Sequence, residues 1–263
     1  MEVIGFFAAS LIGVSLGLIG GGGSILTVPV LVYIFAVNPT LSTSYSLFIV
    51  GSTSLIGALG HYHRDELSLH TAFLFGFPSI VTIWLTRKFL IPAIPETFFQ
   101  IGNVTVTKSL STMVLFATLM ILASLSMIKD DKGTSSDATV RMPSHSRLLI
   151  YAIAIGLVTG LLGAGGGFLL IPALIYLMHL PMKKAIGTSL LIIAVNSLIG
   201  FLGDLGRYPT DWVFLTEITG IAIFGVLLGS ALSKKIGATR LKKGFGWFVL
   251  IIGMLILVNQ LLY

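Results

Sequence analysis

The chain has 263 residues, of which 55% are hydrophobic and only 10% are charged, and its mean hydropathy is +1.01. Roughly a quarter of the residues of soluble domains are charged, so this composition argues against soluble, disordered and fibrous proteins and leaves the integral membrane class. The absence of cysteine excludes disulfides, thiolate metal sites and a thiol nucleophile. The basic residues behind the net charge of +6 stand at the ends of apolar runs, which indicates membrane topology and not nucleic-acid binding.

Apolar segments of helical character follow one another along the chain. A bilayer core of about 30 Å needs roughly 20 helical residues, and these runs lack the alternation of barrel strands. We therefore predict an all-α integral membrane protein with about ten hydrophobic helical segments. Their expected bounds are 2–19, 24–37, 40–60, 70–90, 109–128, 148–162, 167–180, 183–203, 212–232 and 244–262.

Two stretches interrupt this series. Leu90 to Lys108 contains two prolines and is predicted as a short amphipathic piece at the membrane interface or as an ordinary loop. Lys129 to Arg147 is rich in Ser, Thr and charge, which is typical of a flexible connection. We therefore predict a first membrane repeat over 1–128, a cytoplasmic linker over 129–147 and a second membrane repeat over 148–263.

The two halves match each other without gaps at an offset of about 143 residues. The segment GVSLGLIGGGGSILTVPVLVY at 13–33 matches GLVTGLLGAGGGFLLIPALIY at 156–176. The segment TSYSLFIVGSTSLIGALGHYHR at 43–64 matches IGTSLLIIAVNSLIGFLGDLGR at 186–207. Internal duplication of this kind is typical of secondary transporters.

The basic residues predict the orientation of the chain. Assigning loops alternately to the two sides of the membrane places about twelve basic residues on one side and about four on the other, so the first side is cytoplasmic and both termini are extracytoplasmic. Each half then crosses an odd number of times, and the halves are inverted repeats. If the first two segments of each half formed one broken span, the split would fall to about ten to six.

Glycine clusters at 20–23 and 163–167 interrupt apolar sequence in both halves. Each glycine lowers helix stability by about 1 kcal/mol, so four in succession should break the helix. We predict that each cluster is the apex of a re-entrant hairpin and that the two apices meet near the membrane centre. Open backbone and the positive end of the following helix would bind an anion there. Close helix packing through small residues, as at Gly13 and Gly17, is the alternative.

Polar residues recur at matching positions after each cluster. Ser46 and Thr53 share one helix face, as do Ser189 and Asn196, and these side chains would line a pathway or hydrogen-bond between helices. The predicted substrate-binding residues are Gly22, Gly23, Ser46, Thr53, Gly165, Gly166, Gly167, Thr188, Ser189 and Asn196.

The ionisable residues indicate two entrances to a transport pathway, and their pattern does not indicate a catalytic site. Arg64 and Arg207 are predicted to gather anions at the two entrances, or to reach the interface as single arginines do. No cluster of His, Asp and Glu has metal spacing, and no nucleophile and base stand together. We therefore expect no enzyme activity, no metal and no cofactor.

The two glycine–proline stretches, each followed by a TSxxSL-like or GTSLL segment, resemble the TauE/SafE family of sulfite exporters and sulfonate uptake permeases. The segments GVLLGSALSKKI and LKKGFGWFVLIIGMLIL also look like that family. Ser44-Tyr45-Ser46 departs from the pattern where the second copy has Gly187-Thr188-Ser189. The resemblance implies transport of a small sulfur oxyanion, such as sulfite or a sulfonate, across a bacterial inner membrane, coupled to a proton or cation.

Together these observations favour a secondary transporter that holds a small anion between the two apices and works by alternating access. The lipid bilayer is its expected surroundings, and no nucleic acid is expected as a partner. An anion channel and a non-transporting membrane scaffold are the alternatives.

Overall fold

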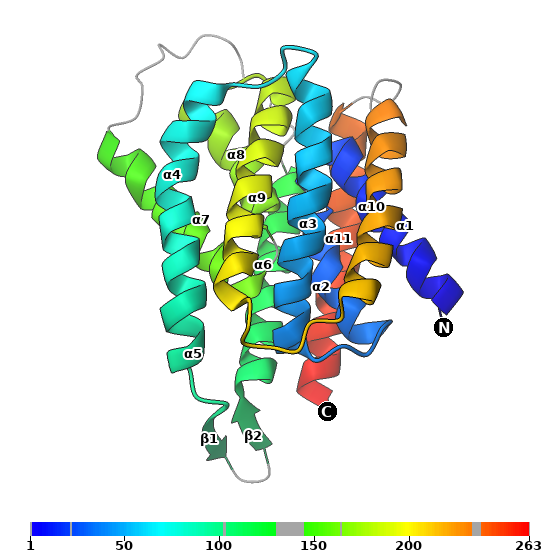
Figure 1. Ribbon diagram of the computed structural model, residues 1–263, viewed down its shortest axis with the longest axis vertical. Helices are drawn as coiled ribbons and strands as arrows, with labels where there is room; N and C mark the ends of the chain where they lie inside the picture. Colours follow the sequence, from blue (N-terminus) through cyan, green and yellow to red (C-terminus); the bar gives the residue numbers. More distant parts are fainter. Residues whose placement is uncertain are drawn as a thin grey trace.

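The computed structural model describes residues 2–21, 23–101, 104–129, 145–163, 165–232 and 238–262, and helices account for nearly all of them (Figure 1). The prediction of an all-α membrane protein is confirmed. The elements are α1 (Glu2–Ile19), α2 (Ser24–Tyr33), α3 (Pro39–Tyr62), α4 (Leu69–Leu85), the π-helical turn η1 (Thr86–Leu90), α5 (Ile91–Ala93), β1 (Thr97–Ile101), β2 (Val104–Thr107), α6 (Lys108–Lys129), α7 (His145–Leu162), α8 (Gly167–Met178), α9 (Met182–Asp204), α10 (Trp212–Leu232) and α11 (Ala238–Leu262).

Corresponding helices of the two halves run in opposite directions. We call the end of the bundle with loops 63–68 and 179–181 the upper end, and the end with loops 34–38 and 205–211 the lower end (Figure 1). Helix α3 runs upward, α4 downward and α6 upward, whereas α9 runs downward, α10 upward and α11 downward. The packing repeats in the same way, because α1 lies against α10 as α7 lies against α4, and α3 pairs with α9 as α6 pairs with α11. The predicted inverted repeats are confirmed.

Each half opens with a helical hairpin broken at its glycine cluster. Helix α1 ends at Ile19 and α2 begins at Ser24, whereas α7 ends at Leu162 and α8 begins at Gly167. The hairpin of α1 and α2 opens toward the lower end, and the hairpin of α7 and α8 opens toward the upper end (Figure 1). The two bends therefore enter the bundle from opposite sides.

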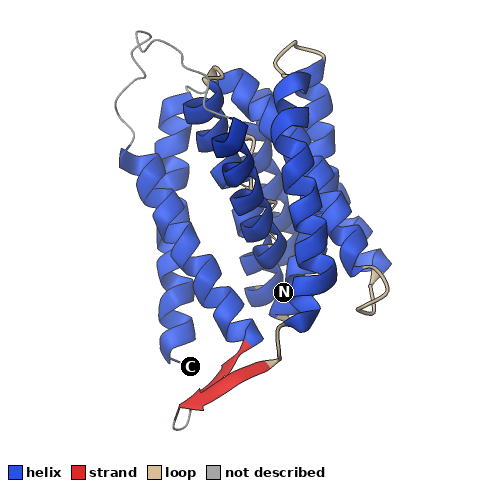
Figure 2. Cartoon of the chain, turned by 90° about the vertical axis from the view of Figure 1, so that its left-hand side faces the viewer, coloured by secondary structure: helices blue, strands red, loops and turns tan. Residues whose placement is uncertain are grey.

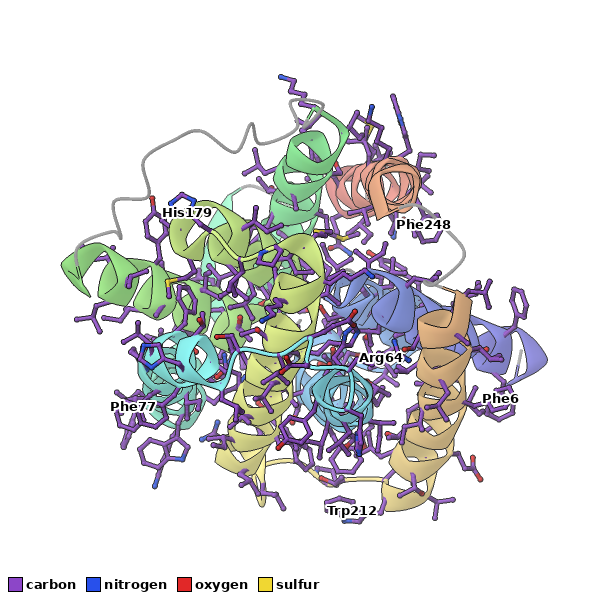
Figure 3. All side chains as sticks on the ribbon, turned by 90° about the horizontal axis from the view of Figure 1, so that it is seen from above. Phe6, Arg64, Phe77, His179, Trp212 and Phe248 are labelled. Carbon is purple, nitrogen blue, oxygen red and sulfur yellow. The ribbon has the colours of Figure 1, made fainter. Side chains whose placement is uncertain are left out.

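Helices α3 and α9 form the centre of the bundle. The described residues contain five helices long and apolar enough to cross a membrane: Pro39–Tyr62, Leu69–Ala93, Lys108–Leu125, Met182–Asp204 and Trp212–Leu232. The spans of α3 and α9 are 67% and 72% buried, whereas no other span exceeds 39%. Large apolar side chains cover the outside, and Phe77, Trp212 and Phe248 lie at the periphery in the view from above (Figure 3).

The interior of the bundle contains buried polar side chains in addition to its apolar core. Ser46, Thr53 and Ser54 on α3 and Asn196 and Ser197 on α9 are all fully buried. In lipid, polar side chains lie between helices because the bilayer core offers them no partner. The distribution fits a membrane-embedded bundle whose polar groups surround the α3–α9 pair.

The stretch predicted as an amphipathic piece or a loop contains a β-hairpin. Strand β1 pairs antiparallel with β2, and the hairpin projects from the lower end of the bundle (Figure 2). Alternating Val and Thr at 104–107 favour a strand over a helix, because β-branched residues fit a pleated surface. The chain returns from this hairpin directly into α6.

Candidate functional site

The helix breaks depend on backbone conformations that glycine adopts readily. The φ angles of Gly20, Gly163, Gly165 and Gly166 lie between +66° and +81°, a region that costs other residues about 1–2 kcal/mol. Gly23 and Gly166 are the N-cap residues of α2 and α8, and they carry no side chain to accept the first N–H groups of those helices. The glycine clusters therefore leave two helix N-termini without a side-chain cap, although the N–H groups of Leu26 and Leu169 already bond to the carbonyls of Gly23 and Gly166.

The two breaks contact each other inside the bundle. A β-carbon on Gly21 would lie 2.7 Å from the carbonyl carbon of Gly167, and one on Gly167 would lie 2.5 Å from Gly21 Cα. Gly20 packs on Ile186 of α9, and Gly163 packs on Thr43 of α3. Thr43 and Ile186 are equivalent positions of the repeat, so both breaks dock in the same way on opposite central helices.

Hydroxyl groups without partners face the second break. A β-carbon on Gly165 would lie 3.1 Å from Ser197 Oγ, and one on Gly166 would collide with Thr159 Oγ1. Both oxygens are buried and have no hydrogen-bond partner within the described part of the chain. The hydroxyl of Ser54, the repeat equivalent of Ser197, is likewise buried and unpartnered there. Unpaired buried hydroxyls are uncommon because desolvation is costly, so these groups offer unused donors.

The contact between the two breaks lies well inside the bundle, at the level of the middle of α3 and α9. A β-carbon on Gly165 would lie 2.7 Å from Val50 Cγ1 and 3.0 Å from Ile193 Cγ2, and both residues stand midway along their helices. Open backbone at such depth is tolerated only where it is buried in protein or lines a cavity. Here it is buried against the opposite break and the central helices.

Several of the predicted polar residues already have partners. Thr53 Oγ1 donates to the carbonyl of Ile49 at 2.6 Å, and Ser189 Oγ donates to the carbonyl of Ile186 at 2.8 Å. Thr188 Oγ1 accepts the N–H of Ser68 at 3.0 Å, which ties α9 to the start of α4. These three hydroxyls serve the helices, and they are satisfied in this arrangement.

Asn196 and Ser46 complete the predicted set within the described residues. The Asn196 amide exchanges hydrogen bonds with Ser79 Oγ on α4, with Nδ2 donating at 2.9 Å and Oδ1 accepting at 3.1 Å. This is the interhelical alternative for that residue. Ser46 Oγ is buried without a hydrogen-bond partner there. A β-carbon on Gly23 would lie 2.5 Å from the backbone nitrogen of Leu16 and from Ser15 Oγ on α1, and Gly22 lies outside the described residues.

The two predicted mouth residues have different surroundings. Arg64 is exposed at the upper end, near the middle of the bundle in the view from above (Figure 3). Arg207 lies at the lower end, where Nη1 donates to the carbonyl of Arg87 at 2.9 Å and stands 3.7 Å from Asp204 Oδ1. Arg207 therefore helps to hold η1, in addition to any role with anions.

Sequence reasoning missed an ion pair beside this arginine. Arg87 Nη1 and Asp204 Oδ2 are 2.8 Å apart, and each side chain is only 1% exposed. Arg87 stands at the end of an apolar run next to Lys88, where a charged residue is expected to reach the interface. Thr159 was also missed, although its place in the last turn of α7, directly before the break, indicates that it lies close to the break. No group of three His, Asp or Glu that could hold a metal occurs in the described ranges.

The family model for the sulfite exporter TauE/SafE matches residues 5–256. The chain belongs to the TauE/SafE family. The resemblance predicted from the glycine–proline stretches is thereby confirmed, and it extends over nearly the whole chain.

Relatives of this TauE/SafE chain carry one kind of name. A probable membrane transporter protein of Xylella fastidiosa (strain 9a5c) is 29% identical over 95% of this chain and 92% of its own length. The probable membrane transporter protein YdhB of Bacillus subtilis (strain 168) is 24% identical over 94% of this chain and 96% of its own length. The probable membrane transporter protein MJ0441 of Methanocaldococcus jannaschii is 22% identical over 91% of this chain and 88% of its own length. No solved structure matches the chain. Family and relatives support a multi-pass membrane transporter.

Proposed function

We propose that the chain is a secondary transporter that moves a small sulfur oxyanion, such as sulfite or a sulfonate, across the cytoplasmic membrane by alternating access. One observation carries the proposal: two helix breaks meet inside the bundle, and the hydroxyls of Thr159 and Ser197, which have no partner among the described residues, face one of them. Backbone N–H groups at helix N-termini and hydroxyls are donors that suit an oxyanion. The sulfur comes from the family description, which names sulfite export.

The contact between the breaks favours a carrier over an anion channel. Gly21 and Gly167 touch backbone to backbone, and the central helices pack on both sides of them. An anion can reach the site only if the two hairpins separate from one side. Because the hairpins open toward opposite ends, separation at one end leaves the other end closed, which is alternating access.

Counterflow in proteoliposomes tests the proposal. Purified protein loaded with unlabelled sulfite should take up labelled sulfite with saturation, and methanesulfonate and sulfate should compete to different extents. Thr159→Val and Ser197→Ala remove the two unpartnered hydroxyls and should each reduce uptake about tenfold, since a hydrogen bond to a charged group is worth about 1.5–3 kcal/mol. Thr118→Val and Ser124→Ala are matched controls, because those hydroxyls bond to carbonyls of their own helix, α6, which contributes none of the nearest contacts of the described break glycines.

Other results would support other functions. Ion conductance at the rates of a channel would show that the protein is an anion channel and not a carrier. Absence of both flux and anion-dependent thermal stabilisation would favour a scaffold. If the Thr159 and Ser197 variants transported like the two controls, the anion would bind elsewhere.

A further inference from the structure

The lower end of the bundle holds a buried ion pair between the two halves. Arg87 belongs to η1 of the first half, and Asp204 is the last residue of α9 in the second half. The 2.8 Å contact joins Nη1 to Oδ2, with both side chains 99% buried. Burying two charges is expensive, and an apolar pair of similar size would serve packing at least as well. The pair therefore points to a role beyond holding the helices together.

The pair is incompletely satisfied. Arg87 Nε and Asp204 Oδ1 have no hydrogen-bond partner within the described segments, and the guanidinium of Arg207 approaches Oδ1 only to 3.7 Å. Asp204 thus engages the guanidinium through one oxygen. An arginine that binds carboxylate or another oxyanion usually does so through two parallel hydrogen bonds, so Arg87 keeps unused donor capacity.

Arg87 is separated from the second glycine break by one residue. Its Nη1 also donates to Thr43 Oγ1 at 3.1 Å, and Nη2 reaches the carbonyl of Thr43 at 3.5 Å. Thr43 in turn packs directly on Gly163, where an added β-carbon would lie 2.6 Å from Thr43 Cβ. A fixed positive charge therefore lies beside the neutral donors of the break, on the side that faces the lower end.

We propose that Arg87 is a substrate-binding residue that receives the oxyanion at the lower end, and that Asp204 occupies its guanidinium when no anion is bound. This inference rests on the proposed function, and it adds the guanidinium of Arg87 as the positively charged group of the proposed anion site. The incoming oxyanion exchanges for the carboxylate of Asp204, so the charge on Arg87 stays compensated. Loss of the ion pair removes one link between η1 and the end of α9, whereas the hydrogen bonds from Arg207 to the carbonyls of Arg87 and Lys88 keep η1 in place while the anion enters.

The decisive comparison keeps or removes Arg87 in the absence of its internal competitor. Asp204→Asn retains the shape of the side chain and removes the charge, and Arg87→Gln combined with Asp204→Asn removes both charges without leaving either one buried alone. Lys108→Gln is the control, because Lys108 is a second buried cation at this end and donates to the carbonyl of Ile91 at 2.7 Å. Thermal-shift titrations with sulfite and with methanesulfonate give an apparent Kd for each protein.

We expect Asp204→Asn to bind the preferred anion about tenfold more tightly than the unsubstituted protein, because the competing carboxylate is gone. The double variant should bind it at least about tenfold more weakly than Asp204→Asn, and Lys108→Gln should not differ from the unsubstituted protein. Equal affinities for Asp204→Asn and the double variant would overturn this inference alone. If the unsubstituted protein bound neither anion, the proposed function would fall and this inference with it.

Discussion

At the scale of single residues, the glycines act through conformation and closeness and not through flexibility. Gly166 has a φ of +68° and lies against Thr159, so both its backbone and its missing side chain matter. The helix breaks were predictable because several glycines close together in an apolar run destabilise a helix. The partners of these glycines were not predictable, since packing between distant segments leaves no local pattern.

Gly166→Ala should destabilise the protein by about 1–2 kcal/mol from the left-handed backbone alone, and by more because Thr159 must move. The melting temperature in detergent measures the effect. Gly220→Ala is the matched control, since Gly220 lies within α10 with nothing inside 4 Å of an added β-carbon. That change should raise stability slightly, by up to about 1 kcal/mol. A Gly166→Ala protein as stable as the parent would contradict the described bend.

The ion pair of Arg87 and Asp204 could not be predicted from the sequence around either residue. The two residues stand 117 positions apart, and each lies at the end of an apolar run, where charges normally reach the interface. Nothing in either neighbourhood distinguishes a buried charge from an interfacial one. Only the approach of η1 to the end of α9 reveals the pair.

At the scale of helices, small residues bring α1 and α10 into backbone contact. A β-carbon on Gly13 would collide with the carbonyl of Ala222, and one on Gly17 would collide with that of Val226. Gly225 and Gly229 on α10 meet the carbonyls of Ser10 and Val14 in the same way. Each helix carries two glycines four residues apart, as in other close membrane crossings. The contacts of Gly13 and Gly17 are therefore those of close helix packing, which was the alternative role expected for these glycines from the sequence.

Gly225→Leu should force α1 and α10 apart and lower the free energy of unfolding by about 1–3 kcal/mol, the usual cost of overpacking. Gly220→Leu on the same helix should change it by less than about 0.5 kcal/mol, because that position is open. Thermal melting and yield after detergent extraction report both variants. Equal melting temperatures for the two would mean that the helices do not approach as described.

The β-hairpin marks a different limit at this scale. Strands β1 and β2 were not predicted from the sequence, because strands of five and four residues are too short for a clear alternating pattern. The two prolines and the scattered polar residues of this stretch indicated a loop instead. The long apolar segments around it were predicted well, since twenty consecutive apolar residues leave few alternatives.

At the scale of the whole molecule, the distribution of charge predicts the orientation in the membrane. The upper end carries Arg64, Lys129, Lys183 and Lys184, and we predict that it faces the cytoplasm. The absence of cysteine makes labelling free of background. An impermeant maleimide should label Leu205→Cys in intact cells and Lys183→Cys only after permeabilisation, because both positions are exposed and lie at opposite ends. The reverse pattern would invert the topology.

The opposed docking of the two bends has a consequence for the energetics of the molecule. Under the proposed alternating access, the halves would exchange their conformations, and because they share one architecture and face opposite ways, the second structure would be built from the same kinds of contact. The free-energy gap between these two forms would then depend on positions at which the halves differ, such as Asp204 and its counterpart His61. For a transporter of this kind, we therefore expect substitutions at such asymmetric positions to bias which face of the membrane the protein is open to at rest.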